Sequence, residues 1–145
     1  MKIKIWRKDP RAKLPQKSTS GSIGYDIFAL EETQISPKEF KLVRTGLVIK
    51  GEPPYGVFLF PRSSLFKKKQ LIMPNSIGVI DFDYCGKDDE IKIPLLNLGS
   101  QVATISAGEK IAQLIFIKVA EPILEEVDTP PQDVSRGGFG STGIK

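Results

Sequence analysis

The chain has 145 residues, of which 40% are hydrophobic and 26% charged, and its net charge at pH 7 is +4. This length and composition predict one ordinary domain with its own hydrophobic core. Because the sequence has no histidine and one cysteine, it excludes histidine-based triads and zinc sites, which need several nitrogen or sulfur ligands. Any catalysis therefore depends on carboxylates, hydroxyls, Lys, Arg and a hard metal such as Mg²⁺, and the basic balance suits an anionic substrate.

Alternation of polar and apolar residues dominates the chain and predicts many short strands separated by Gly, Pro, Asn and Ser. In chain order the expected strands are Lys2–Trp6, Tyr25–Leu30, Leu42–Lys50, Gly56–Phe60, Leu71–Met73, Val79–Asp81, Glu90–Leu98, Val102–Ile105 and Ile111–Val119. One helix is expected from Ser63 to Gln70, capped by Ser63 or Ser64. Such a pattern is typical of an all-β sandwich, jelly roll or barrel.

The last stretch of the chain differs in composition from the rest. Four glycines fall between Gly137 and Gly143, where a regular element would be costly. We therefore expect one all-β domain over residues 1–128 and a flexible arm over residues 129–145. The arm is either a frayed tail or a lid that binds phosphate and a base, and the lone aromatic Phe139 favours the lid.

No apolar run approaches the roughly 20 residues of a membrane span, and the first residues alternate as a strand does, unlike a signal peptide. We expect an intracellular, cytoplasmic protein that binds neither a membrane nor nucleic acid.

Two carboxylates, Asp81 and Asp83, lie inside the apolar run Gly78–Tyr84. A carboxylate is costly to bury unless something pairs with it. The run therefore either ends in a polar surface turn or lines a site that holds water, a cation or a ligand.

Three further segments carry candidate site residues. Arg62, Ser63 and Ser64 open the expected helix and suit a phosphate, although an ordinary cap with a surface Arg explains them too. Gln113 lies among aliphatic residues and needs partners, from a ligand or from the backbone. Asp26 follows a Gly/Ser loop and either holds a metal-bound water or caps a turn.

Together these segments resemble the deoxyuridine triphosphatase (dUTPase) family of trimeric all-β nucleotidohydrolases. The matching segments follow the order of the family's motifs: Gly24–Ile27, Pro61–Leu65, Asn75 with Gly78–Tyr84, Gly108–Ile115 and Gly137–Gly143. The resemblance implies a distorted jelly roll of the β-clip type and a homotrimer with active sites at subunit interfaces. It also implies hydrolysis of dUTP to dUMP and pyrophosphate with Mg²⁺, which limits uracil in DNA and supplies dUMP for thymidylate synthesis.

The resemblance also implies roles for particular residues. Asp81 would deprotonate the water that attacks the α-phosphorus, and Tyr84 would pack under the deoxyribose. Reading of the uracil edge falls to Asn75 and to the backbone of Val79, Ile80 and the strand near Lys92. The phosphates would be held by Arg62, Ser63, Ser64 and Gln113, while Asp26 would contact the metal through water. From the arm, Phe139 would stack on uracil, with Arg136, Gly140 and Ser141 at the phosphates.

Three departures from the family's pattern bear on these roles. Lys87-Asp88-Asp89 lengthens the tip before Glu90, Arg136 lies only three residues before Phe139, and Ser64 replaces a common Gly. Asp81 and Tyr84 are an odd number of residues apart, so a straight strand would point them to opposite faces. We therefore predict a bend near Phe82-Asp83.

Two alternatives remain at this stage. One is a dCTP deaminase, alone or bifunctional with triphosphatase activity, although the Asp-Pro-Gly-Phe sequence usual there is absent. The other is a non-catalytic nucleotide-binding trimer, which would have no need of Asp81, Asn75 and Gln113.

Overall fold

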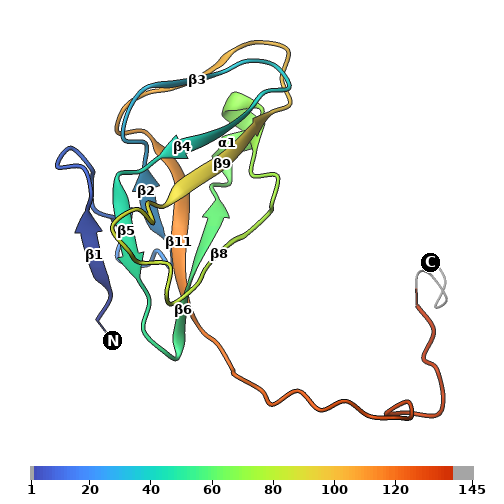
Figure 1. Cartoon of the computed structure of the whole chain (residues 1–145). Helices are drawn as coiled ribbons and strands as arrows, with labels where there is room; N and C mark the ends of the chain where they lie inside the picture. Colours follow the sequence, from blue (N-terminus) through green and yellow to red (C-terminus); the bar gives the residue numbers. More distant parts are fainter. Residues whose placement is uncertain (1, 139–145) are drawn as a thin grey trace.

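The computed structural model describes residues 2–138, which form an all-β body with one short helix and an extended C-terminal segment (Figure 1). The predicted all-β class is confirmed. The elements in chain order are β1 Lys4–Arg7, β2 Tyr25–Phe28, β3 Thr33–Ile35, β4 Phe40–Arg44, β5 Leu47–Lys50, β6 Tyr55–Pro61, α1 Ser64–Lys69, β7 Leu71–Ile72, β8 Gly78–Ile80, β9 Lys92–Asn97, β10 Ala103–Ile105 and β11 Lys110–Lys118.

The strands pair antiparallel in four small sheets. The largest has the order β2-β11-β6-β8, and a second has the order β4-β9-β7, while β1 pairs with β5 and β10 with β3. Because neighbours in a sheet come from distant parts of the sequence, the fold brings residues of β2, β6 and β11 side by side. The candidate site depends on this arrangement.

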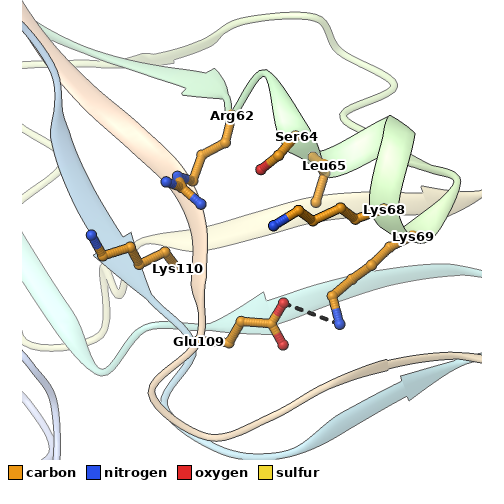
Figure 2. A pocket seen from close by; sticks show the side chains of 7 residues that line it. All are labelled: Arg62, Ser64, Leu65, Lys68, Lys69, Glu109 and Lys110. Atoms are coloured by element: carbon orange, nitrogen blue, oxygen red, sulfur yellow. Dashed lines mark ion pairs between the residues drawn. The ribbon is translucent and has the colours of Figure 1, made fainter. Parts of the chain in front are cut away.

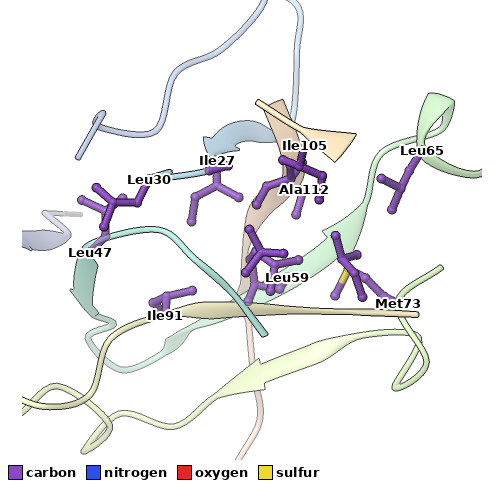
Figure 3. Packing of buried hydrophobic residues seen from close by; sticks show 14 of the residues in the cluster. Ile27, Leu30, Leu47, Leu59, Leu65, Met73, Ile91, Ile105 and Ala112 are labelled. Carbon is purple, nitrogen blue, oxygen red and sulfur yellow. The ribbon is translucent and has the colours of Figure 1, made fainter. Parts of the chain in front are cut away.

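The core is a single cluster of aliphatic side chains contributed by nearly every strand (Figure 3). Ile27 of β2, Leu59 of β6 and Leu114 of β11 are fully buried there. Their burial fixes which face of the large sheet points inward, since side chains alternate along a strand. Asp26 precedes Ile27 and Gln113 precedes Leu114, so the side chains of Asp26 and Gln113 point to the opposite face of the sheet.

The predicted strand Leu42–Lys50 is wrong as one element, because it breaks into β4 and β5. Gly46 has a positive φ of 70°, and its N–H donates to Glu90 Oε1 at 2.9 Å. Arg44 also donates to both carboxylate oxygens of the buried Glu90. The Glu90 side chain thus lies at the corner between β4 and β5. The predicted strand that begins at Glu90 is therefore shorter, since β9 begins at Lys92. No strand was predicted at β3, which pairs with β10.

The helix α1 is two residues shorter than expected. Ser63 is the N-cap residue, as predicted, but its side chain makes no capping hydrogen bond. The helix ends at Lys69, and its C-cap residue Gln70 adopts a left-handed φ of 57°. Leu65 is its buried residue and anchors the helix to the core.

The predicted bend near Phe82-Asp83 is confirmed. Strand β8 ends at Ile80, and the N–H of Tyr84 donates to the carbonyl of Asp81 at 3.2 Å across a turn. The Tyr84 hydroxyl reaches the carbonyl of Glu90 at 3.4 Å. The turn therefore frees Asp81 and Tyr84 from strict alternation.

Residues 119–138 contain neither helix nor strand and run away from the body, as the orange-to-red trace of Figure 1 shows. Val119 is tied to the body by its N–H, which donates to the carbonyl of Pro54 at 2.7 Å. Beyond it, the apolar Ile123 and Leu124 are 96% and 89% exposed. Over residues 2–138, no helix has both the length and the apolar character needed to cross a membrane.

Candidate functional site

Four of the predicted site residues line one cavity at the end of β6. Arg62 and Ser63 follow that strand, Asp26 comes from β2 and Gln113 from β11. Asp26 and Gln113 are direct partners in the β2–β11 register and therefore share a face of the sheet. We call this the first cavity.

A register irregularity in β11 brings one more side chain to the same face. The pairing with β2 shifts between Lys110 and Ala112, as at a β-bulge. Lys110 and Gln113 are three residues apart, so a regular strand would point them to opposite faces. The shift instead lets Lys110 reach Asp26.

The Asp26 carboxylate is the hub of this group. It accepts a hydrogen bond from Arg62 Nε at 2.9 Å on Oδ1 and pairs with Lys110 Nζ at 2.7 Å on Oδ2. The Ser18 hydroxyl donates to Oδ2 at 2.5 Å, and Lys110 in turn donates to Ser18 at 2.8 Å. One buried carboxylate thus fixes two cationic side chains from β11 and from the end of β6.

The environment of Asp26 lowers its pKa from the ordinary value of 3.8. Burial acts in the opposite direction and is the largest single influence. The hydrogen bonds from Lys110 and Ser18 and the charges of Arg62 and Lys110 together outweigh it. Asp26 is therefore ionised at neutral pH.

The side-chain nitrogen of Gln113 has a hydrogen-bond partner in the protein. Its Nε2 donates to the carbonyl of Pro61 at 3.1 Å. Gly24 lies directly against its side chain, so a Cβ at residue 24 would collide with the amide oxygen. The prediction that the backbone supplies a partner for Gln113 is therefore confirmed for the amide nitrogen. The amide group lies in the same cavity as Arg62 and Ser63.

Ser64 faces a different cavity, although it follows Ser63 directly. This second cavity is also lined by Arg62, Lys68, Lys69, Glu109 and Lys110 (Figure 2). Arg62 therefore separates two cavities. Neither Lys68 nor Lys110 was predicted from the sequence as a site residue. For Lys68 a signal existed, because Ser64 and Lys68 are four residues apart and share one face of the expected helix.

The second group of predicted residues follows the edge strand β8. Asn75 lies in the turn before it, where its side chain donates to the carbonyl of Ile77 at 3.4 Å. Val79 is 64% exposed on the strand and Ile80 is half-buried, and Asp81 and Tyr84 are exposed in the turn after it. This segment presents a carboxylate, a phenol ring and an unpaired strand edge.

Within one chain these two groups lie at opposite ends of β6. Gly78 pairs with Leu59 and Ile80 with Val57, so β8 runs away from the end that carries Arg62. Five residues separate Val57 from Arg62, or about 16 Å at 3.3 Å per residue. A general base needs hydrogen-bond reach of its target, directly or through one water. Asp81 therefore cannot act at the Arg62 cavities of its own chain.

The remaining predicted residues are not brought to either group. Lys92 is exposed at the start of β9, opposite Arg44 of β4. Arg136 is exposed in the extended segment. Phe139, Gly140 and Ser141 lie outside the described residues.

The inserted tip Lys87-Asp88-Asp89 makes one local and one long-range contact. Asp89 Oδ2 accepts from the Gly86 N–H at 2.7 Å, and Asp88 pairs with Lys8 at 3.2 Å. The tip is thus held against the segment that follows β1.

Within residues 2–138, no group of three or more acidic, Cys or His residues is arranged to bind a metal ion. Mg²⁺, however, keeps several waters and takes one or two carboxylates together with substrate phosphates. Asp26 is the carboxylate of the first cavity, and Arg62, Ser18 and Lys110 occupy three of its roughly four acceptor positions. The residues present therefore fit a phosphate-held Mg²⁺ that Asp26 contacts through a water.

A family model described as dUTPase matches residues 10–143 of the chain. The chain belongs to the dUTPase family. Proteins named deoxyuridine 5'-triphosphate nucleotidohydrolase are similar to it over its whole length. The protein from Finegoldia magna is 40% identical, with 99% of each chain covered, and the one from Hydrogenobaculum sp. is 38% identical, with 100% of each covered.

Solved dUTPase structures share the fold, which is of the jelly-roll type. The dUTPase from Streptococcus mutans has a TM-score of 0.76 and 31% identity, covering 83% of this chain and 98% of that one. The dUTPase of Staphylococcus bacteriophage 80alpha, solved with dUPNHPP, has a TM-score of 0.86 at 24% identity and covers 99% of each chain. A mutant dUTPase from phage phi11 of S. aureus, whose structure reveals a coordinated structural Mg(II) ion, has a TM-score of 0.82 at 21% identity, covering 91% of this chain and 100% of that one.

Proposed function

We propose that this dUTPase-family protein hydrolyses dUTP to dUMP and pyrophosphate by attack of water at the α-phosphorus. One observation supports this above all: the turn after β8 holds both Asp81 and Tyr84 and leaves both side chains exposed beyond the end of the strand. The reaction would limit uracil in DNA and supply dUMP for thymidylate synthesis.

In the proposed reaction Asp81 accepts a proton from the attacking water. The water oxygen forms a bond to the α-phosphorus while the bond from that phosphorus to the α–β bridging oxygen breaks, and pyrophosphate leaves. Phosphoryl transfer needs positioning and charge neutralisation more than covalent help. A carboxylate base of this kind contributes about 10²–10⁴-fold to the rate.

The segment around β8 would select the nucleoside. Its open edge offers the backbone groups of Val79 and Ile80 to the uracil edge, with Asn75 in the turn before it, whereas the strand near Lys92 belongs to another sheet. A base with the wrong donors would leave buried polar groups unpaired, which is heavily penalised. Tyr84 would pack under the deoxyribose and exclude a 2′-hydroxyl.

The cavities around Arg62 would hold the triphosphate through Arg62, Ser63, Ser64 and Gln113. Mg²⁺ would neutralise phosphate charge, and a metal-bound water would donate to Asp26. The arm, residues 129–145, would close over the site, with Phe139 on uracil and Arg136, Gly140 and Ser141 at the phosphates. Residues 1–128 would form the catalytic domain.

Because Asp81 and Arg62 of one chain lie too far apart to share a substrate, a complete site needs more than one copy of the chain. We propose a homotrimer. An unpartnered apolar face supports assembly: five residues of the sheet β4-β9-β7 point away from the core and are exposed or half-buried, and the register places them side by side, namely Phe40, Leu42, Ile72, Pro94 and Leu96. Exposed apolar patches of this kind mark interaction surfaces.

Release of pyrophosphate from dUTP, dCTP, dTTP and UTP, each with Mg²⁺, tests the proposal. We expect rapid release from dUTP and release from the other three at least about 100-fold slower. Equal rates with all four nucleotides, or none with dUTP, would refute it. Ammonia from dCTP would instead support the deaminase alternative.

A further inference from the structure

The phenol of Tyr84 is held by the backbone of a buried residue. Its hydroxyl donates to the carbonyl of Glu90 at 3.4 Å, and over residues 2–138 this is the one hydrogen bond that the side chain makes. Tyr84 is 41% exposed, so packing constrains it less than it constrains a core residue. The direction of the ring therefore depends on where the Glu90 carbonyl is held.

The carboxylate of Glu90 ties that residue to the corner between β4 and β5. Its Oε1 accepts from the N–H of Gly46 at 2.9 Å and from Arg44 Nε at 3.2 Å. Its Oε2 accepts from a terminal nitrogen of Arg44, also at 3.2 Å. Glu90 itself is buried. Both carboxylate oxygens of Glu90 are thus fixed by the same corner.

The residue after Glu90 is bound to the corner through its backbone. The N–H of Ile91 donates to the carbonyl of Leu47 at 2.8 Å, and its carbonyl accepts from the Thr45 hydroxyl at 2.6 Å. Residues 81–89, in contrast, contain neither helix nor strand. The chain that returns from the Tyr84 turn is therefore first anchored to the body at Glu90.

A buried ion pair supplies geometry more than stability. The desolvation of two charges offsets most of their attraction, so apolar residues of similar size often stabilise a fold as well or better. An apolar residue at position 90, however, would leave the buried N–H of Gly46 without a partner. It would also lose the two-point contact with Arg44, which defines the direction of the Glu90 side chain.

We propose that Glu90, held by Arg44, is a positioning residue that fixes the Tyr84 ring and thereby sets the preference for deoxyribose over ribose. The inference rests on the proposed function, which places Tyr84 under the sugar. While the Glu90 carbonyl engages the hydroxyl, the ring cannot tilt to admit a 2′-hydroxyl. Because selectivity is a difference between two affinities, a looser ring favours the ribonucleotide.

The test compares Glu90→Gln with Glu31→Gln. Glu31 pairs with the same Arg44 at 3.7 Å, but its side chain is 43% exposed, so this pair contributes little. The measured quantity is the kcat/KM for dUTP divided by the kcat/KM for UTP. We expect this ratio to fall about fivefold in Glu90→Gln, as for loss of one neutral hydrogen bond, and to stay within about twofold in Glu31→Gln.

A double mutant separates positioning of the ring from a general loss of structure. Tyr84→Phe removes the hydroxyl and should by itself lower the ratio about fivefold. If Glu90 acts through that hydroxyl, adding Glu90→Gln to Tyr84→Phe should lower the ratio by less than about a further twofold. A merely structural effect would lower it as much in either background. Should Glu90→Gln fail to fold, Arg44→Lys takes its place, because it keeps the charge but not the planar fork.

Binding of dUMP and of UMP to the full-length protein, measured by calorimetry, repeats the comparison without turnover. An unchanged preference in Glu90→Gln, an equal loss in Glu31→Gln, additive losses in the double mutant, or a wild type that binds the two equally would overturn the proposal. A wild type that prefers dUMP, and loses that preference in Glu90→Gln, but does not hydrolyse dUTP would refute the proposed function and leave the positioning role standing.

Discussion

The guanidinium of Arg62 and the carboxylate of Asp26 are joined by a hydrogen bond of 2.9 Å between Nε and Oδ1. The bond links the end of β6 to β2, two strands that are separated by β11 in the sheet. The Nε atom of the Arg62 guanidinium thus faces the protein, and its two terminal nitrogens are left for a ligand. Asp26 therefore positions Arg62, the proposed phosphate-binding group, as well as facing the first cavity.

Replacement of Asp26 by Asn should weaken substrate binding more than it slows the chemical step. The amide can still accept one hydrogen bond, but it offers no charge to hold Arg62 and Lys110 in place. We expect the KM for dUTP to rise about tenfold while kcat falls less, since loss of a charge-assisted bond costs about 1.5 kcal/mol, which is about tenfold in affinity. A kcat that collapses at unchanged KM would show instead that Asp26 acts in the chemical step. Steady-state kinetics at saturating Mg²⁺ makes the distinction.

The same carboxylate makes the stability of the fold depend on pH. The pKa of Asp26 is lower in the folded protein than its ordinary value of 3.8, so its contribution is complete above that value. The contribution is lost as the pH falls through the folded pKa. Asp9, whose pKa the hydrogen bonds from Arg11 lower to about 2, adds to the same acid window.

We therefore expect thermal melting of the wild type to fall steadily as the pH drops below about 4. In Asp26→Asn the melting temperature should decline less steeply with falling pH, because the Asp26 contribution is absent and the Asp9 contribution remains. Melting curves between pH 7 and pH 2.5, monitored by circular dichroism, measure the difference. Parallel declines in the two proteins would show that Asp26 does not contribute.

The sequence predicted the strands better than the arrangement of the candidate site residues. Alternation and turn residues identified most strands, and the odd spacing of Asp81 and Tyr84 required the turn that the structure contains. In contrast, the group around Asp26 depends on the pairing of β2 with β11 and on the irregularity beside Lys110. Such register details are long-range, so local periodicity carries no information about them.

The corner between β4 and β5 shows the same limit. Residues 42–50 read as one apolar strand, yet Glu90 lies 44 residues from Gly46 in sequence and bonds to it there. The sequence pattern also could not predict that Arg62 lies between two different cavities. Ser63 and Ser64 are adjacent in sequence, but the start of α1 directs them to different sides.

Asp81 and Asp83 provide a matched pair for testing the general base. Both are exposed carboxylates of the same turn, but only Asp81 carries the proposed proton-accepting role. Asp81→Asn should lower kcat by about 10²–10⁴-fold, the range for general-base catalysis. Asp83→Asn should stay near the wild-type rate. Binding of the analogue dUPNHPP should survive in both variants, since neither change touches the phosphate cavities. Wild-type turnover by Asp81→Asn would remove this carboxylate from the mechanism.

The apolar face of the sheet β4-β9-β7 gives a test of assembly. Leu42 is 52% exposed on β4 and lies directly opposite Pro94 of β9. A charge there would be buried without a partner if copies of the chain pack on this face, which is costly. We expect Leu42→Glu to convert the proposed trimer into monomers and to abolish turnover, because Asp81 then has no Arg62 within reach.

The control for this change is Trp6→Glu on β1, which introduces the same charge at a residue that is 51% exposed on another sheet. It should leave both the molecular mass by light scattering and the rate unchanged. Mixing inactive Asp81→Asn with an inactive Arg62→Gln variant sharpens the test. If sites combine residues of different subunits, mixed trimers regain part of the wild-type activity after subunit exchange. Failure of the mixture to recover activity, in spite of proven exchange, would contradict shared sites.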